Sequence, residues 1–148
     1  MADELKLVLD TQVFLRALIN PKSAAGALFA DWSHIFTLVT CDQIDAEILD
    51  VLQRPKIRAK FPQITDSLIE QTRKLLLLAD RVVVNENDID AICRDPKDDI
   101  FLACAKRSQA NYLVSEDKDL LVLESHHTTR ILNILEMLMI LRESSQTE

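Results

Sequence analysis

Acidic residues stand next to apolar runs in this sequence, where their carboxylates could act together. Asp10 comes directly after the run Leu5–Leu9, and Asp117 lies just beyond the run Tyr112–Ser115. Asp98 stands at the start of a segment with helical periodicity. In an open α/β sheet, ligands bind outside the carboxyl ends of the strands. If these strands are neighbours, the acids from separate segments meet at one edge.

Such a cluster of carboxylates has to be compensated electrostatically. Two carboxylates about 6 Å apart repel each other by roughly 3 kcal/mol at an effective dielectric constant near 20. The cluster therefore needs raised pKa values or a bound divalent cation. Oxygen ligands without a nearby histidine or thiolate favour Mg²⁺ or Mn²⁺ over Zn²⁺. An ion of this kind can activate water for attack on a phosphodiester.

The segment 97–109 has one acid on its apolar face. At 100° per residue, Asp98 lies within about 60° of the apolar stripe, whereas Asp99 points elsewhere. Asp95 followed by Pro96 is typical of a helix N-cap and a first helical position. An acid in the first turn also stabilises a helix end, so periodicity alone leaves a capping role for Asp98 open.

A second amphipathic segment, at 43–53, carries two candidate acids. Glu47 lies on one flank of its apolar stripe and Asp45 on the other. Periodicity cannot choose between them, and either one alone is more often a solvated flank residue than a ligand.

Short apolar runs alternate with longer helical patterns along the chain. This alternation predicts right-handed βαβ units in a mostly parallel sheet with helices on both faces. We expect one three-layer α/β/α domain over residues 1–142, followed by a polar, fraying tail at 143–148. The expected strands are Leu5–Leu9, Phe36–Thr40, Arg81–Val84, Tyr112–Ser115 and Arg130–Leu132. The expected helices are 12–19, 24–33, 43–53, 65–79, 97–109 and 134–142.

Composition excludes several classes of function. The 148 residues include one glycine, Gly26, where average usage would give about ten, so no glycine-rich phosphate loop is present. The net charge of −7 argues against sequence-blind nucleic-acid binding over a broad basic surface. The N-terminus has no basic region typical of a signal peptide, and no apolar run approaches the roughly 18 residues of a membrane span. We expect a cytoplasmic protein without membrane association.

Four motifs occur in the order found in PIN domains. Leu7-Val8-Leu9-Asp10-Thr11 resembles the hhhDTN opening of that family. Ala46-Glu47-Ile48-Leu49 and the following Arg54-Pro55-Lys56 resemble the acid-bearing helix of its toxin–antitoxin branch. Asp95-Pro96-Lys97-Asp98-Asp99 resembles the DPxDD segment of that branch, and Asp117-Lys118-Asp119-Leu120-Leu121 its DKDLL turn. One such motif would be weak, whereas four in order are specific.

The resemblance implies a metal-dependent ribonuclease with the sheet order 3-2-1-4-5. It favours Glu47 over Asp45 and implies that four acids hold Mg²⁺ or Mn²⁺. It also implies a supporting hydroxyl from Ser115, a supporting Thr11 and an outer-shell acid at Asp119. Gln12 departs from the family pattern, which has asparagine there, and this longer amide puts catalytic efficiency in doubt. The four acids are Asp10, Glu47, Asp98 and Asp117.

Contacts to RNA are harder to predict from the sequence. Arg54, Lys56 and Arg58 form a basic group that could contact phosphates, although such a group is more often only a solvated loop. Arg16 lies nearer the expected edge and is equally ambiguous. The segment 134–142 is apolar almost all round, which predicts a buried helix or a subunit contact, and a homodimer is a hypothesis only.

The leading hypothesis is an endoribonuclease in which metal-activated water attacks single-stranded RNA, leaving a 5′-phosphate and a 3′-hydroxyl. Membership of the toxin branch would imply a protein antitoxin as partner. A degenerate PIN-fold module that only binds protein is an alternative, motivated by Gln12. An aspartyl-nucleophile phosphohydrolase is a third hypothesis, but Gln12 stands where that family has its second acid, and the chain scarcely has room for a cap domain.

Overall fold

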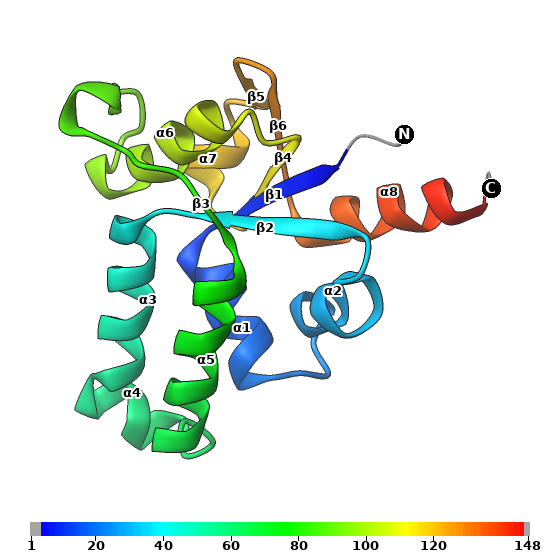
Figure 1. Ribbon diagram of the computed structural model, residues 1–148. Coiled ribbons are helices and arrows are strands. Elements are labelled where there is room, and N and C mark those ends of the chain that lie inside the picture. Colours follow the sequence, from blue (N-terminus) through cyan, green and yellow to red (C-terminus); the bar gives the residue numbers. More distant parts are fainter. Residues whose placement is uncertain (1–3, 147–148) are drawn as a thin grey trace.

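The computed structural model describes residues 4–146, and Figure 1 shows a central sheet with helices on both of its faces. Five strands run parallel. Four of them lie where apolar runs predicted strands, whereas the short strand β3 (Asp80–Arg81) shares only Arg81 with the strand expected at Arg81–Val84. Their spatial order places the first strand in the middle of the sheet. The parallel strands are β1 (Leu5–Leu9), β2 (Phe36–Thr40), β3 (Asp80–Arg81), β4 (Tyr112–Val114) and β6 (Thr129–Leu132).

The order of the parallel strands confirms the expected topology, and one short strand adds to it. The full order is β3-β2-β1-β4-β6-β5, in which the expected fifth strand is β6. The extra strand β5 (Ser125–His126) forms an antiparallel hairpin with β6 at the sheet edge. A two-residue strand before a turn has too few residues to show alternation, so the sequence pattern did not reveal it.

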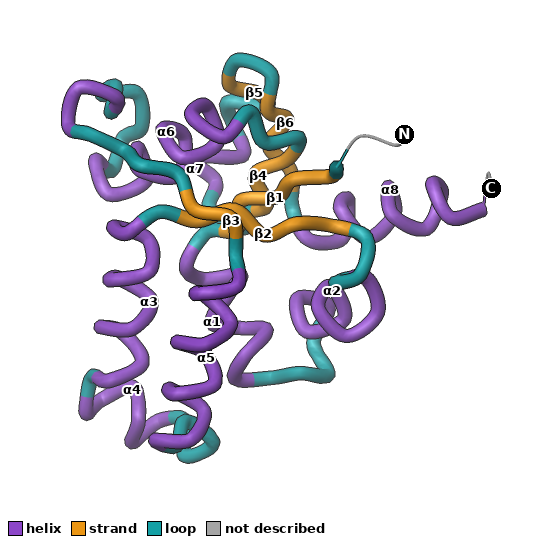
Figure 2. The backbone as a smooth tube through the Cα atoms, viewed as in Figure 1, coloured by secondary structure: helices purple, strands orange, loops and turns teal. Residues whose placement is uncertain are grey.

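Helices cover the sheet as Figure 2 shows, and most of their bounds match the predicted ranges to within one or two residues. Two short helices, α4 and α7, were not expected. The helices are α1 (Thr11–Ile19), α2 (Ala24–Trp32), α3 (Asp42–Gln53), α4 (Pro55–Lys60), α5 (Asp66–Leu78), α6 (Asp99–Ser108), α7 (Lys118–Leu121) and α8 (Ile134–Gln146). Short 3₁₀ helices occupy Glu86–Asp88 and Pro96–Asp98.

Three boundaries differ from the sequence-based expectation. The strand expected at Arg81–Val84 ends at Arg81, and Val83 is 67% exposed. Only Asp80 and Arg81 pair with β2, because the chain then leaves the sheet edge for the loop that carries the first 3₁₀ helix. The helix expected at 97–109 begins at Asp99, after a 3₁₀ turn. The last helix continues to Gln146, so residues 143–146 are helical where a fraying tail was expected, and 147–148 lie outside the described residues.

The central strands are buried between the helical layers. Leu7, Val8, Leu113 and Val114 are fully inaccessible to solvent, as expected for strands covered on both faces. Buried side chains of α1, α3, α6 and α8 complete one continuous core. None of the helices among residues 4–146 has the length and apolar character needed to cross a bilayer. The carboxyl ends of β1, β2 and β4 are thereby held at one rigid edge.

Candidate metal centre

The structure brings acids from four separate segments to the carboxyl edge of the sheet. Asp10 follows β1 and caps α1, and Asp117 follows β4 and caps α7. Asp98 immediately precedes α6, and Glu47 lies on α3 after β2. All four line a single pocket of about 210 Å³. The meeting of distant segments that the sequence predicted therefore occurs.

Asp10 is the most deeply buried of these acids. It is 4% exposed, and its Oδ1 accepts a hydrogen bond from the Val13 backbone N–H at 2.8 Å. The hydroxyl of Ser115, itself fully buried, donates to the other oxygen, Oδ2. Burial raises the pKa of Asp10 and repulsion by Asp117 adds to the rise, whereas the bonds from Ser115 and Val13 oppose it. Asp10 is thus fixed in orientation by both neighbours.

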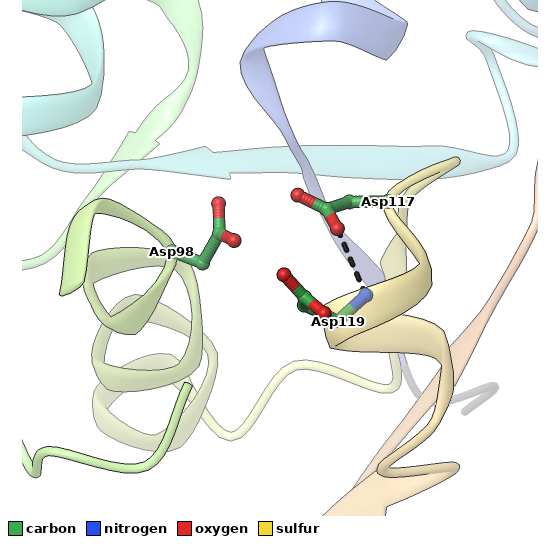
Figure 3. Close-up of side chains that lie close together, drawn as sticks. All are labelled: Asp98, Asp117 and Asp119. Carbon is green, nitrogen blue, oxygen red and sulfur yellow. Dashed lines mark hydrogen bonds between the residues drawn. The ribbon is translucent and has the colours of Figure 1, made fainter. Parts of the chain in front are cut away.

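A chain of hydrogen bonds fixes the acids that follow β4. The backbone N–H of Asp117 donates to Ser115 Oγ at 2.9 Å, and the N–H of Asp119 donates to Asp117 Oδ1 at 2.8 Å (Figure 3). One hydroxyl, that of Ser115, thus connects Asp10 to the Asp117 turn. Ser115 thus lies beside Asp10 and Asp117, and its supporting role in the site stays a prediction.

Asp98, Asp117 and Asp119 approach one another closely enough to share an ion. One carboxylate oxygen from each lies within 4.8 Å of the others, and Figure 3 shows the three groups facing a common space. Asp98 Oδ2 is buried and has no hydrogen-bond partner among the described residues. The pKa of Asp98 is raised to about 7, first by burial and then by the neighbouring Asp117 carboxylate. Asp119 therefore lies in the same cluster as Asp98 and Asp117, and the outer-shell role expected for it stays a prediction.

The structure distinguishes Glu47 from Asp45, the two acids of α3 between which helical periodicity could not choose. The Thr11 hydroxyl donates to Glu47 Oε2 at 2.7 Å, and Glu47 lines the acidic pocket. Asp45 instead pairs with Arg81 at 2.6 Å and accepts a hydrogen bond from the Thr40 hydroxyl at 2.6 Å. Asp45 is therefore engaged in tying α3 to β2 and β3, and it is not among the residues that line the pocket.

Three residues of the pocket were not singled out as site residues by the sequence. Asp95, Lys97 and Phe101 line it alongside the expected acids, Thr11 and Gln12. Asp95 accepts a hydrogen bond from the Lys97 backbone N–H at 3.0 Å, as its predicted capping role requires. The signal that could have found them is their position in the same short segment as Asp98, since residues next to a helix N-terminus share its edge of the sheet.

The basic residues predicted to contact RNA lie outside the acidic pocket. Arg54 pairs with Asp50 at 2.8 Å, and Arg58 pairs with Asp66 at 2.9 Å. Lys56 is exposed on α4. Arg16 lines a separate groove of about 290 Å³ between α1, α3 and α4, which Gln12 also lines. The structure does not bring these four side chains into the acidic pocket, and their contact with RNA stays a prediction.

The donor set of the pocket fits a hard divalent cation. Asp98, Asp117 and Asp119 each offer a carboxylate oxygen, and no histidine or cysteine lines the pocket. A buried carboxylate oxygen without a partner is costly unless a cation or a proton satisfies it. The raised pKa of Asp98 has the same cause, because a carboxylate that is costly to bury in its charged form binds a proton more tightly. Oxygen ligands of this kind favour Mg²⁺ or Mn²⁺.

Known proteins resemble this chain in sequence and in fold. The chain is 29% identical over 129 residues to the uncharacterized protein MJ1680 of Methanocaldococcus jannaschii, covering 84% of this chain and 78% of that protein. A crystal structure of VapBC2 from Rickettsia felis, bound to a DNA fragment from its promoter, matches with a TM-score of 0.55 at 12% identity. That match covers 87% of this chain and 98% of the other.

A second solved structure shares the fold, and a family model matches the sequence. Mycobacterium tuberculosis VapC20, described as a toxin that cleaves the sarcin-ricin loop, matches with a TM-score of 0.55 at 15% identity, over 84% of this chain and 98% of that one. The model of the PIN domain matches residues 6–119, a range that contains every acid of the cluster. This chain belongs to the PIN domain family, and the order of its parallel strands agrees with that family's fold.

Proposed function

We propose that this chain is a metal-dependent endoribonuclease and the toxin of a toxin–antitoxin pair. The observation that carries the proposal is the pocket in which Asp10, Glu47, Asp98 and Asp117 meet, with Asp98 Oδ2 buried and unpartnered. Membership of the PIN domain family supports a nuclease. The likeness in fold to VapC20, which is described as a toxin that cleaves the sarcin-ricin loop, supports the toxin assignment.

Each acid has a distinct part in the proposed reaction. Asp98, Asp117 and Asp119 would hold Mg²⁺ or Mn²⁺, and Asp10 lines the same pocket as Asp98 and Asp117. Such an ion supplies an activated water and neutralises charge that develops on the phosphodiester. Ser115 and the Val13 N–H orient Asp10, so its carboxylate needs little reorganisation when substrate arrives.

Glu47 is held at one oxygen and left unbound at the other. Thr11 donates to Oε2, and Oε1 has no hydrogen bond among the described residues. Glu47 can therefore accept a hydrogen bond from water at the pocket while its side chain stays fixed, or serve as a further oxygen ligand. Hydrolysis in this pocket would leave a 5′-phosphate on one product and a 3′-hydroxyl on the other.

The decisive experiment is cleavage of a single-stranded oligoribonucleotide. Wild-type protein should cleave it with Mg²⁺ or Mn²⁺ and lose the activity in EDTA. Asp10→Asn should lower kcat by about a hundred-fold or more, whereas Asp31→Asn, an exposed aspartate on α2 remote from the pocket, should not. Undiminished cleavage by Asp10→Asn, or full activity in EDTA, would reject the assigned site.

The toxin assignment has its own readout in cells. Induced expression of the wild-type chain should arrest bacterial growth, and expression of Asp10→Asn at the same level should not. Active enzyme that leaves growth unaffected would separate the ribonuclease from the toxin role. Relief of arrest by the protein of an adjacent reading frame would identify the antitoxin partner.

A protein-binding module without catalysis remains the second candidate because of one residue. Gln12 lines the acidic pocket where the family pattern has asparagine. Calorimetric titration with Mg²⁺ or Mn²⁺ separates the two functions, since a degenerate site should bind neither ion in the millimolar range. Metal binding together with cleavage of RNA would exclude this second candidate.

A further inference from the structure

Lys97 is a basic residue in an otherwise acidic pocket. The residues that line the pocket include five acids, and Lys97 is the one lysine or arginine among them. It lies directly between Pro96 and Asp98 on the short 3₁₀ helix that leads into α6. Its position places a positive charge next to the carboxylates proposed to hold the metal.

The backbone at Lys97 is fixed by its neighbours. The side chain of Asp95 accepts a hydrogen bond from the Lys97 N–H at 3.0 Å, and Pro96 restricts the first position of the turn. The chain that follows Lys97 is also fixed, because the buried Asp99 accepts hydrogen bonds from the backbone N–H groups of Ile92 and Cys93. The backbone from which the Lys97 side chain extends is thus held beside the pocket.

The ammonium group of Lys97 has no partner in the part of the chain that the structure describes. Among residues 4–146 it forms no ion pair or hydrogen bond, although Asp95 and Asp98 are close in sequence and line the same pocket. Several other basic groups are paired, including Arg54, Arg58 and Arg81. An exposed, unpaired cation beside a reaction pocket is available to an incoming anion.

We infer that Lys97 is a substrate-contact residue that binds a non-bridging phosphate oxygen of the RNA at the acidic pocket. The inference rests on the proposed function and supplies one positive contact for the RNA backbone at an acidic pocket, in a chain of net charge −7. A lysine contact to phosphate positions the backbone without reading the base. The basic residues of α4 cannot replace it there, because they do not line the pocket.

The test compares three variants with the wild type. Lys97→Gln removes the charge and keeps most of the length, Lys97→Arg keeps the charge, and Lys74→Gln is the matched control. Lys74 is an exposed lysine on α5 that forms no ion pair among the described residues and does not line the pocket. Cleavage of a single-stranded oligoribonucleotide with Mg²⁺ gives kcat and KM, and fluorescence anisotropy with Ca²⁺ and an intact labelled probe gives Kd as a function of NaCl.

Loss of one charged phosphate contact should lower kcat/KM by about ten-fold or more, mainly through KM. The slope of log Kd against log [NaCl] should become shallower by about 0.7 for Lys97→Gln, as one phosphate contact on a single strand predicts. Lys97→Arg should recover most of both losses, and Lys74→Gln should match the wild type. Calorimetry should show that Lys97→Gln still binds Mg²⁺, which separates a lost contact from a damaged pocket.

The possible outcomes distinguish the role inferred for Lys97 from the proposed ribonuclease function on which it rests. If the wild type cleaves RNA and Lys97→Gln has the kinetics and salt slope of Lys74→Gln, the role of Lys97 is overturned and the ribonuclease stands. If Lys97→Gln loses Mg²⁺ binding together with activity, Lys97 is structural and the inference is also overturned. A wild-type protein that neither binds nor cleaves RNA overturns both proposals.

Discussion

At the scale of single residues, Asp98 connects the geometry of the pocket to its dependence on pH. Its pKa is raised to about 7, first by burial and then by Asp117. A carboxylate has to lose its proton before it can bind a metal ion, so binding competes with that proton. Metal binding should therefore tighten as the pH rises toward the raised pKa.

We expect the affinity for Mg²⁺ to fall by up to about ten-fold per pH unit below pH 7, because one proton is displaced per ion. Calorimetric titrations at pH 6, 7 and 8 measure this dependence directly. Asp98→Asn should bind the ion more weakly and with little dependence on pH over the same range. A wild-type Kd that is constant from pH 6 to pH 8 would contradict the assignment of Asp98.

The same carboxylate should destabilise the metal-free fold. Its pKa is about 7 in the folded protein against an ordinary value of 3.8, so between these values the folded state holds more protons than the unfolded state. Stability from this group is greatest below about pH 4 and falls as the pH rises to about 7. At pH 8 in EDTA, Asp98→Asn should raise Tm by about 2–4 °C, the effect of roughly 1 kcal/mol.

The neighbouring Asp99 provides the contrast for that measurement. It is 4% exposed and accepts hydrogen bonds from two backbone N–H groups. Asp99→Asn should therefore lower the free energy of unfolding by about 1–3 kcal/mol, opposite in sign to Asp98→Asn. If both substitutions destabilise the metal-free protein equally, the Asp98 carboxylate does not destabilise the fold as argued above.

How far residue roles followed from the sequence depended on the kind of contact involved. Asp10 and Asp117 were candidates because each follows a strand, and Asp98 because the expected helix placed it on an apolar stripe. In the structure α6 begins after Asp98, and Asp99, which the same helical wheel pointed elsewhere, is buried. The choice between Glu47 and Asp45 depended on long-range partners, Thr11 for one and Arg81 for the other. Periodicity within a helix carries no information about such partners, so only the resemblance to PIN domains favoured Glu47.

At the scale of elements, long segments were predictable and short ones were not. The strand bounds of β1 and β2 match their apolar runs. The helices α4 and α7, of six and four residues, were missed, because so short a stretch shows no helical period. The run Val82–Val84 was wrongly expected to extend a strand, since its apolar character reflects loop packing as well as a sheet.

At the single glycine, a steric contact between α2 and the preceding segment outweighs helix propensity. Gly26 lies in the first turn of α2, and a Cβ there would stand 2.2 Å from the Pro21 carbonyl oxygen. Helix propensity alone would make Gly26→Ala stabilising by about 1 kcal/mol. The steric contact predicts a loss of about 1–3 kcal/mol instead.

Chemical denaturation of Gly26→Ala decides between these two effects. Ala30→Gly, the reverse exchange at an exposed position of the same helix, measures propensity alone and should cost about 1 kcal/mol. A Gly26→Ala variant more stable than the wild type would show that α2 moves away from Pro21 freely. The one glycine of the chain has a packing role, in agreement with the absence of a phosphate-binding loop.

At the scale of the whole molecule, the topology makes the site. The strand order puts β1 between β2 and β4, so the segments after these strands converge on one pocket. The alternation of strands and helices predicted a mostly parallel sheet, and the family resemblance implied this order, whereas the edge strand β5 was not predicted. Metal binding should therefore stabilise the fold as a unit, since one ion would connect segments far apart in the chain.

We expect Mg²⁺ at a hundred times its Kd to stabilise the protein by about 2.7 kcal/mol, which corresponds to a rise in Tm of about 5–10 °C. EDTA should reverse the rise. NaCl at equal ionic strength should reproduce only the part that comes from screening a net charge of −7, and Asp117→Asn should retain only that part. If Mg²⁺ raised the Tm of Asp117→Asn as much as that of the wild type, the ion would be acting on the acidic surface in general, and the pocket at the carboxyl edge of the sheet would not be its site.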